Sequence, residues 1–412
     1  MGGTVFKMTP TGTLTTLVNF KGIGVVIGDG ATNAGSYPLG NLIRTDDGSF
    51  YGTTWSGGAS NKGTVFKVTP AGSLTTLVEF TDNGANNKGA GPSGSLILGA
   101  DGEYYGTTVV GGSGGLGTIY KMTPGGTLTT LVEFTGNGTT NKGAKPRGGL
   151  TLATDGNFYG TTSEGGSGGA GTAFRMAASG ELTTLAEFTQ DGSGSTGSPS
   201  AVTKGPDGNF YGITIGGGSN GDGTVFKATP TGTISTLAEF SANGPSTKGV
   251  APSGSLTLGS DGNFYGMTPQ GGTADKGTLF RVTPAGLVSN LIEFTGNGAI
   301  NKGAFPVGSL VLGPNAAYYG MTRAGGSGGG GTIFKMTAAG DLSTLVEFVS
   351  TDLSVEREKG VYPCGSLTLG QDGSFYGMTS EGGTSELGTI FKVTSAGLLT
   401  KLVDFSGNEP GY

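Results

Sequence analysis

Short runs of alternating apolar and polar residues, separated by turn residues, fill the chain from end to end. Residues 63–80, GTVFKVTPAGSLTTLVEF, show the pattern, because two such runs flank a Pro-Ala-Gly turn. Alternate side chains of a strand point to opposite faces, so Phe66, Val68, Leu74 and Val78 would share one face of a hairpin. Eight near-copies of this hairpin occur in the sequence, which predicts a repetitive all-β fold.

A second recurring element, an aromatic-Tyr-Gly triplet, sets the length of the repeat. Its tyrosines are spaced by 54, 54, 52, 54, 54 and 57 residues: Tyr51, Tyr105, Tyr159, Tyr211, Tyr265, Tyr319 and Tyr376. One unit, residues 92–134, contains SLILG and EYYGTT around an Asp-Gly turn, then GTIYKM and LTTLVEF around a Pro-x-Gly turn. Two hairpins in series over roughly 40 to 50 residues are typical of a β-propeller blade.

We therefore expect a single β-propeller domain over residues 1–412, with seven complete four-stranded antiparallel blades. The predicted blades are residues 38–80, 92–134, 146–188, 199–240, 252–294, 306–348 and 363–405. The longest connection should run from the rim of one blade to the axis of the next. LTTLVEF would then be the outermost strand and SLILG the innermost, with both long loops on one face of the ring, where binding residues are often carried.

An eighth copy of the outer hairpin, residues 3–20, comes without an inner hairpin. Our first expectation is a seven-bladed ring with this hairpin as an appendage. An eight-position ring with one half-blade, or a piece of a longer chain, is also compatible with the sequence.

Composition excludes several kinds of chemistry and partner. The chain has no histidine, which removes the commonest general base, the usual nucleophile pairs and histidine-ligated zinc. The single cysteine, Cys364, rules out an intramolecular disulfide framework. A net charge of −6 with 13% charged residues provides no basic field for nucleic acid. Because no apolar run is long enough for a span, we expect no membrane insertion by this chain.

The unit PxGxLxxxxDGxFYGTTxxGGxxxxGTVFKxTPxGxLTTLxEF resembles the GloVer (Gloeo_Verruco) tandem repeat of bacterial surface and secreted proteins, over residues 3–405. The resemblance is clearest in GGTVFKMTP and in residues 52–67. The order of strands is more loosely similar to that of NHL-repeat propellers. The resemblance implies a secreted or cell-surface location and no biochemical activity. Because no signal peptide or anchor is recognisable in this sequence, the expected location rests on the resemblance alone.

A recurrent Lys-Gly motif in the long links supplies repeated polar candidates. Its lysines would form a partial ring on the long-loop face: Lys88, Lys142, Lys248, Lys302 and Lys359. One interpretation is a multivalent binding surface for acidic glycans or a partner protein. The other is a turn whose lysine is simply solvated. The acid of each LVEF motif, such as Glu79, should lie on the edge strand and discourage pairing between edges.

Residues that break the repeat are candidates for a single site. One candidate is the insertion at residues 350–359, and the others lie in the predicted loops before GTVFK: Trp55, Glu164, Gln270, Arg323 and Glu381. Trp55, the only tryptophan, could stack on a sugar ring or cap its own blade. Arg323 could bind a ligand or pair with a surface acid. Calcium could bind the oxygen-rich residues 82–87 and 191–195, although neither has EF-hand spacing; no other metal or cofactor is expected.

The sequence thus favours a non-enzymatic binding or structural module that recognises carbohydrate or a surface partner through the long-loop face. A first alternative is a self-assembly module, in which an oligomer forms through the edge of the incomplete blade. A second alternative is a carboxylate-based glycan-active enzyme, which would need a pair of acids outside the repeated positions.

Overall fold

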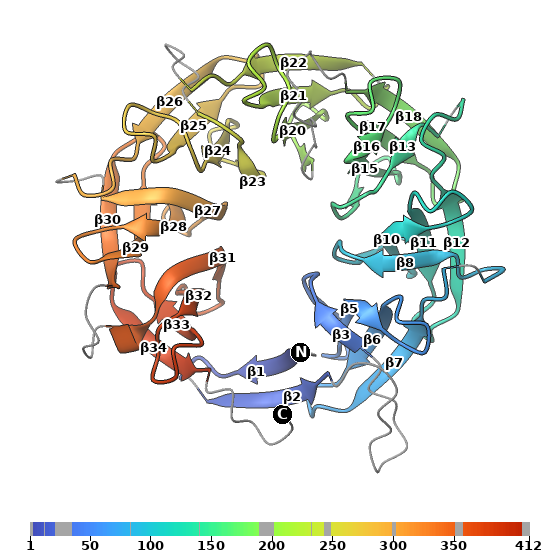
Figure 1. The fold of residues 1–412 in the computed structure, drawn as a ribbon, viewed down its shortest axis with the longest axis horizontal. Coiled ribbons are helices and arrows are strands. Elements are labelled where there is room, and N and C mark those ends of the chain that lie inside the picture. The colour runs from blue at the N-terminus through green and yellow to red at the C-terminus, as the bar shows by residue number, and fades with distance from the viewer. Residues whose placement is uncertain are drawn as a thin grey trace.

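The computed structural model describes residues 3–11, 13–20, 35–82, 84–139, 141–188, 202–231, 233–242, 249–298, 302–350 and 357–405. These residues form antiparallel sheets arranged in a ring around a common axis (Figure 1). Seven four-stranded blades follow one another around the ring in chain order, which confirms the predicted β-propeller. No helix among these residues is long and apolar enough to cross a membrane.

The blades are numbered along the chain. The half-blade consists of β1 (Thr4–Met8) and β2 (Leu14–Asn19). Blade 1 contains β3 (Gly35–Pro38), β4 (Ile43–Arg44), β5 (Phe50–Gly57), β6 (Thr64–Val68) and β7 (Leu74–Glu79). Blade 2 contains β8 (Gly89–Pro92), β9 (Ile97–Leu98), β10 (Tyr104–Gly111), β11 (Thr118–Met122) and β12 (Leu128–Glu133). Blade 3 contains β13 (Gly143–Ala144), β14 (Thr151–Leu152), β15 (Phe158–Thr162), β16 (Glu164–Gly165), β17 (Thr172–Met176) and β18 (Leu182–Glu187).

The remaining four blades each have one innermost strand among the described residues. Blade 4 contains β19 (Thr203–Lys204), β20 (Phe210–Thr214), β21 (Thr224–Ala228) and β22 (Ile234–Glu239). Blade 5 contains β23 (Ser253–Leu258), β24 (Phe264–Thr268), β25 (Thr278–Val282) and β26 (Val288–Glu293). Blade 6 contains β27 (Gly303–Leu312), β28 (Tyr318–Gly325), β29 (Gly329–Met336) and β30 (Leu342–Val349). Blade 7 contains the 3-10 turn η1 (Arg357–Lys359), β31 (Val361–Leu369), β32 (Phe375–Glu381), β33 (Thr389–Val393) and β34 (Leu399–Asp404).

Within a blade the strands follow one another from the axis to the rim, as the connection lengths predict (Figure 1). The second strand can be longer than the sequence suggests, because it continues past the aromatic-Tyr-Gly triplet. In blade 1 this extension of β5 pairs with β3, which belongs to the preceding link. Four of the residues that we placed in loops lie in strands, and that placement was wrong: Trp55 in β5, Glu164 in β16, Arg323 in β28 and Glu381 in β32. The link can pair in this way because its backbone is extended over residues 35–38.

The hydrophobic core lies between neighbouring blades. At the interface of blades 1 and 2, Tyr51 stacks on Tyr104 with ring centroids 4.5 Å apart, and Phe80 meets Tyr120 edge-on at 5.1 Å. The stacked pair recurs around the ring as Tyr105–Phe158, Tyr159–Phe210, Tyr211–Phe264, Tyr265–Tyr318 and Tyr319–Phe375. Each unit thus repeats its aromatic residues because every blade must present them to the blades on both sides.

A glycine and a pair of threonines lie in the interior of blade 1. Gly52 lies under the ring of Phe66, where an added Cβ would come within 2.5 Å of Cζ. Beside it, the buried hydroxyls of Thr54 and Thr64 lie 2.8 Å apart, and the Thr54 hydroxyl donates to the Ser56 carbonyl at 2.9 Å. The blade interior therefore contains a polar contact whose hydrogen bonds are satisfied inside the sheet.

The half-blade occupies its own place in the ring, between blade 7 and blade 1 (Figure 1). On one side, Phe6 contacts Phe405 of blade 7 with ring centroids 6.5 Å apart. On the other side, Phe20 packs edge-on against Phe66 of blade 1 at 5.1 Å. The hairpin is therefore part of an eight-position ring, the arrangement that the sequence left open beside that of a separate appendage.

Candidate functional site

The lysines of the long links lie beside the acids that end the outer strands. Three such ion pairs are Lys88 with Glu133, Lys142 with Glu187, and Lys302 with Glu347. In each pair the lysine belongs to the link that leads into a blade, and the acid lies in the outer strand of that blade. The same carboxylates accept hydrogen bonds from backbone N–H groups before the third strand: Ser113, Ser167 and Ser327. The acid therefore joins link, loop and rim strand.

The titration of Glu187 reflects this arrangement. The hydrogen bond from Lys142 is the main cause that lowers the pKa of Glu187 from 4.5 to about 2, and the Ser167 amide adds to the effect. The ammonium groups of Lys88, Lys142 and Lys302 are each held against a carboxylate, which is the geometry expected of a lysine that stabilises the link. The multivalent lysine surface stays a prediction, because Lys248 lies outside the described residues and Lys359 belongs to η1.

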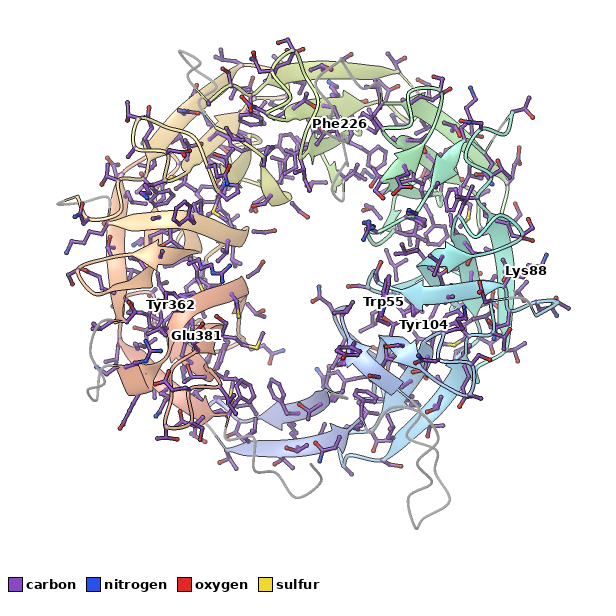
Figure 2. The ribbon with its side chains drawn as sticks, viewed as in Figure 1. Trp55, Lys88, Tyr104, Phe226, Tyr362 and Glu381 are labelled. Atoms are coloured by element: carbon purple, nitrogen blue, oxygen red, sulfur yellow. The ribbon has the colours of Figure 1, made fainter. Side chains whose placement is uncertain are left out.

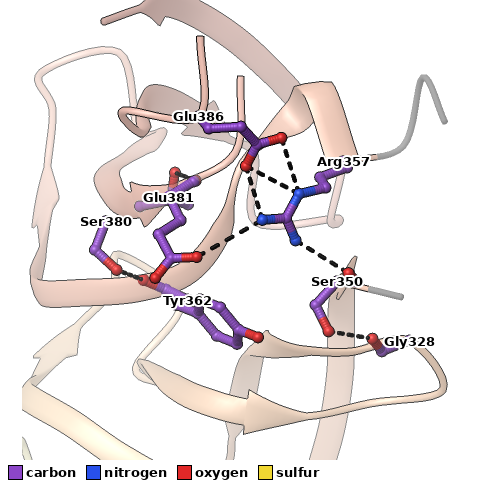
Figure 3. Close-up of polar contacts among 8 residues, drawn as sticks. Gly328, Ser350, Arg357, Tyr362, Ser380, Glu381 and Glu386 are labelled. Carbon is purple, nitrogen blue, oxygen red and sulfur yellow. Dashed lines mark hydrogen bonds and ion pairs between the residues drawn. The ribbon is translucent and has the colours of Figure 1, made fainter. Parts of the chain in front are cut away.

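Arg357 connects the end of blade 6 to a loop of blade 7. Arg357 Nε donates to both carboxylate oxygens of Glu386 at 2.9 Å, and Nη1 donates to the Ser350 carbonyl at 3.0 Å (Figure 3). Glu381, one of the sequence candidates, lies 3.6 Å from the same guanidinium group. Sequence analysis missed Arg357, although it lies in the insertion that we noted, because the sequence does not show which loop residues face the acids.

The two residues predicted to bind a ligand outside the lysine series lie far apart in the ring. Arg323 is an exposed residue of β28 in blade 6, at the place in the repeat that Trp55 holds in blade 1. Blade 7 and the half-blade separate these two blades along the shorter way around the ring (Figure 1). The structure therefore does not combine Trp55 and Arg323 in one site.

Two adjoining hollows beside Trp55 form a polar and aromatic recess. Their volumes are about 600 and 350 Å³, and Tyr37 and Trp55 line both (Trp55 is labelled in Figure 2). Tyr37 is 52% exposed and lies in β3, which pairs with the part of β5 that contains Trp55. We call this recess the Trp55 groove; its lining includes Tyr37, Leu39, Trp55, Lys62, Ser93 and Arg147.

The backbone around the groove explains how the two aromatic residues are held. The indole ring lies against Gly91 of blade 2, where an added Cβ would be 3.2 Å from Cη2. Tyr37 adopts a left-handed backbone with φ of 55°. Residues at the same place before the next prolines, among them Lys145 and Phe305, have φ of 54° and 55°. The left-handed conformation thus belongs to the repeat, and only the side chains make this groove special.

Charged groups border the aromatic residues. Arg147 is exposed, and its guanidinium group makes no ion pair or hydrogen bond with any residue that the structure describes. Lys62 forms an ion pair of 2.8 Å with Asp82, and the two side chains are 40% and 35% exposed. The groove therefore combines the indole ring of Trp55, the phenol of Tyr37 and the guanidinium group of Arg147 with the ion pair of Lys62 and Asp82.

The acids that could support other chemistry already have partners. Glu164 lies 2.9 Å from Lys145, and Asp82 of the oxygen-rich segment 82–87 pairs with Lys62. No group of three or more carboxylate, cysteine or histidine side chains that could hold a metal ion occurs among the described residues. The segment 191–195 lies outside those residues, so calcium binding there stays untested.

The ring of four-stranded repeats defines the class of the protein: a tandem-repeat β-propeller whose units are fused by aromatic contacts. The chain belongs to the Gloeobacter/Verrucomicrobia repeat family, whose profile matches residues 1–200 and 198–412. This match confirms the resemblance seen in the sequence. The comparison with curated proteins gave no significant match.

Solved structures similar to this chain are other propellers. A Mycobacterium tuberculosis puromycin-hydrolyzing peptidase is 12% identical with a TM-score of 0.53, and the match covers 91% of this chain and 54% of the peptidase. A catalytically inactive virginiamycin B lyase from Staphylococcus aureus is 17% identical with a TM-score of 0.48, over 90% of this chain and 96% of the lyase. At 12% identity the likeness to the peptidase shows the fold alone.

Proposed function

We propose that this propeller is a non-enzymatic carbohydrate-binding module that acts outside the cell and binds its ligand in the Trp55 groove. The observation that carries the proposal is the pairing of Trp55 with the exposed ring of Tyr37 in a recess shared by both. Binding sites of this kind join aromatic surface to a few well-placed polar groups. The extracellular location follows from the family resemblance alone.

The groove offers each kind of contact that a sugar ring requires. The apolar C–H face of a sugar can stack on the indole of Trp55, while its hydroxyl groups meet the Tyr37 phenol and the pair of Lys62 and Asp82. Arg147 adds a cation without a protein partner among the described residues, which favours a carboxylate or sulfate group on the sugar. An acidic polysaccharide is therefore the ligand class that the groove suits best.

Repetition argues for one such site and against several. The residues that replace Trp55 in the other blades are Val109, Ser163, Ile215, Pro269, Arg323 and Ser380. None of them presents an aromatic ring. The groove is thus a feature of blade 1, in contrast to the lysine ion pairs, which recur with the fold.

The single tryptophan makes the proposal directly testable, because all indole fluorescence comes from Trp55. Titrating the protein with acidic and neutral cell-envelope polysaccharides should change the emission with the acidic ones and saturate. The variant Trp55→Val copies the residue of blade 2 and should weaken binding, measured by calorimetry, by about 30-fold or more, as for a binding hot spot. Arg147→Ala should weaken binding of acidic ligands selectively.

Matched controls separate the groove from the alternatives. Lys142→Ala alters the lysine series and should leave the affinity within about twofold. Adding calcium or a chelator should have no effect, and reducing-end analysis after incubation should show no cleavage. Saturable binding that survives Trp55→Val, or that is lost with the lysine change, would move the site away from the groove. Release of new reducing ends would favour the enzyme alternative.

A further inference from the structure

The half-blade leaves the inner edge of its β1 strand open. In blade 1 the strand equivalent to β1 is β6, which pairs with β5 on one side and with β7 on the other. Strand β1 pairs with β2 and with no other strand that the structure describes. As a result Thr4 is exposed, whereas the equivalent Thr64 and Thr118 are fully buried. An open strand edge is a template for another strand.

The neighbouring blades expose apolar groups that the ring buries elsewhere. Leu42 of blade 1 is 40% exposed. The equivalent leucines of other blades are between 3% and 7% exposed: Leu96, Leu150, Leu256, Leu310 and Leu367. Phe50 and Tyr376 are only half-buried, and neither stacks on another ring among the described residues. These two residues lie at the ends of the aromatic series that crosses every other interface.

A cavity of about 580 Å³ marks the same place. Its lining comes from the half-blade and from both of its neighbours, and includes Phe6, Met8, Leu42, Phe50 and Gln371. We call this cavity, together with the open edge of β1, the half-blade gap. The gap lies at the place in the ring where the two inner strands of a complete blade would pack between its neighbours.

Charge in the gap matches the turn of an inner hairpin. In blades 1, 4 and 7 the lysine of the third strand pairs with the aspartate of the turn between the inner strands: Lys67 with Asp47, Lys227 with Asp207, and Lys392 with Asp372, at 3.1, 2.9 and 2.8 Å. Lys7 holds this position in β1, is exposed, and makes no ion pair among the described residues. An occupant of the gap should therefore carry an acid in its turn.

From these observations we propose that the half-blade gap is a binding site for a β-hairpin with the inner-strand sequence of this repeat, PxGxLxxxxDGxFYGTT. The hairpin adds its second strand to the open edge of β1. The occupant is a repeat segment whose inner hairpin has no outer pair of its own. A folded second copy of this chain does not fit, because its seven inner hairpins are already paired within their own blades.

The register of the complete blades specifies the contacts. In blade 3, Phe158, Tyr159 and Gly160 lie opposite Met176, Arg175 and Phe174 of the next strand. The bound hairpin would likewise place its phenylalanine, tyrosine and glycine opposite Met8, Lys7 and Phe6. Its phenylalanine would then stack on Tyr376 and its tyrosine on Phe50. The glycine is required, because a Cβ at Gly160 would come within 2.5 Å of the facing ring.

A synthetic peptide with the sequence of residues 146–162 tests the proposal on the whole chain. Calorimetry should show saturable binding at one site, and hydrogen exchange should show new protection of the amides of β1, residues 4–8. The peptide variant Gly160→Val should not bind. The protein variant Trp55→Val should bind the peptide as well as the original chain does, which separates this site from the Trp55 groove.

Charge reversal supplies a matched test of register. Lys7→Glu should weaken peptide binding about fivefold without changing the melting temperature, since Lys7 is exposed. The peptide variant Asp155→Lys should restore the affinity. Absence of saturable binding, or protection that maps to other strands, would overturn the proposal. A dimer in light scattering that protects β1 without peptide would also overturn it, because the occupant would then be a second copy.

Discussion

The aromatic contacts between blades lead to a prediction about stability. Phe80 has no exposed surface and meets Tyr120 at 5.1 Å between ring centroids. Burial of its side chain contributes about 1.5–3 kcal/mol, and the aromatic pair adds about 0.5–1.5 kcal/mol. Phe405, the equivalent residue of blade 7, is only half-buried and lies 6.5 Å from the ring of Phe6. The cavity left by the missing ring adds a further cost, so Phe80→Ala should lower the free energy of unfolding by about 3–5 kcal/mol.

Phe405→Ala should lower the same free energy by only about 1–2 kcal/mol, since part of this side chain is already exposed in the original protein and its ring contact is longer. Urea unfolding followed by both Trp55 fluorescence and circular dichroism measures the two values; coincident curves would license a two-state treatment. Equal losses for the two variants, or a larger loss for Phe405→Ala, would refute the reasoning. Such a result would mean that the interface beside the half-blade is packed as fully as the others.

Three further changes test other contacts of the ring. The folded pKa of Glu187 is lowered from 4.5 to about 2, so its ion pair with Lys142 stabilises the protein above pH 4.5. This stabilisation is lost as the pH falls towards 2. Glu187→Gln should therefore flatten this part of the curve of unfolding free energy against pH, measured in acid titrations. Thr54→Val should cost about 1–3 kcal/mol in urea unfolding, and Thr64→Val less, because the Thr54 hydroxyl both accepts and donates; equal costs would contradict this. Gly52→Ala should lower the melting temperature, since its Cβ would meet a buried ring, and an unchanged value would show that the strand can shift.

Much of the architecture could be predicted because its causes are local. Alternation of apolar residues and the Asp-Gly and Pro-x-Gly turns define the hairpins, and their period defines the blades. Prediction was weaker where a segment has two possible neighbours. The residues around Trp55 and Tyr37 read as loop and link, yet they pair as β5 and β3, because pairing depends on where the link crosses the next blade.

The side-chain sites depended still more on the tertiary structure. The sequence shows that Lys142 and Glu187 recur in their motifs, but their spacing of 45 residues gives no sign that they meet. The same is true of Arg357 and Glu386, which are 29 residues apart. From the sequence alone, a ring of solvated lysines cannot be told from a series of lysine ion pairs. Only the folded blade brings the link and the outer strand together.

The sequence by itself thus determined the two hairpins of each blade, the seven blades and their order, since each follows from contacts within about fifty residues. Only the tertiary structure decided where the half-blade lies and that Trp55 shares a groove with Tyr37. Ring closure joins residues as distant as Phe6 and Phe405, and no periodicity can specify that contact. The unfilled inner edge of β1 is visible only once the two flanking blades are in place.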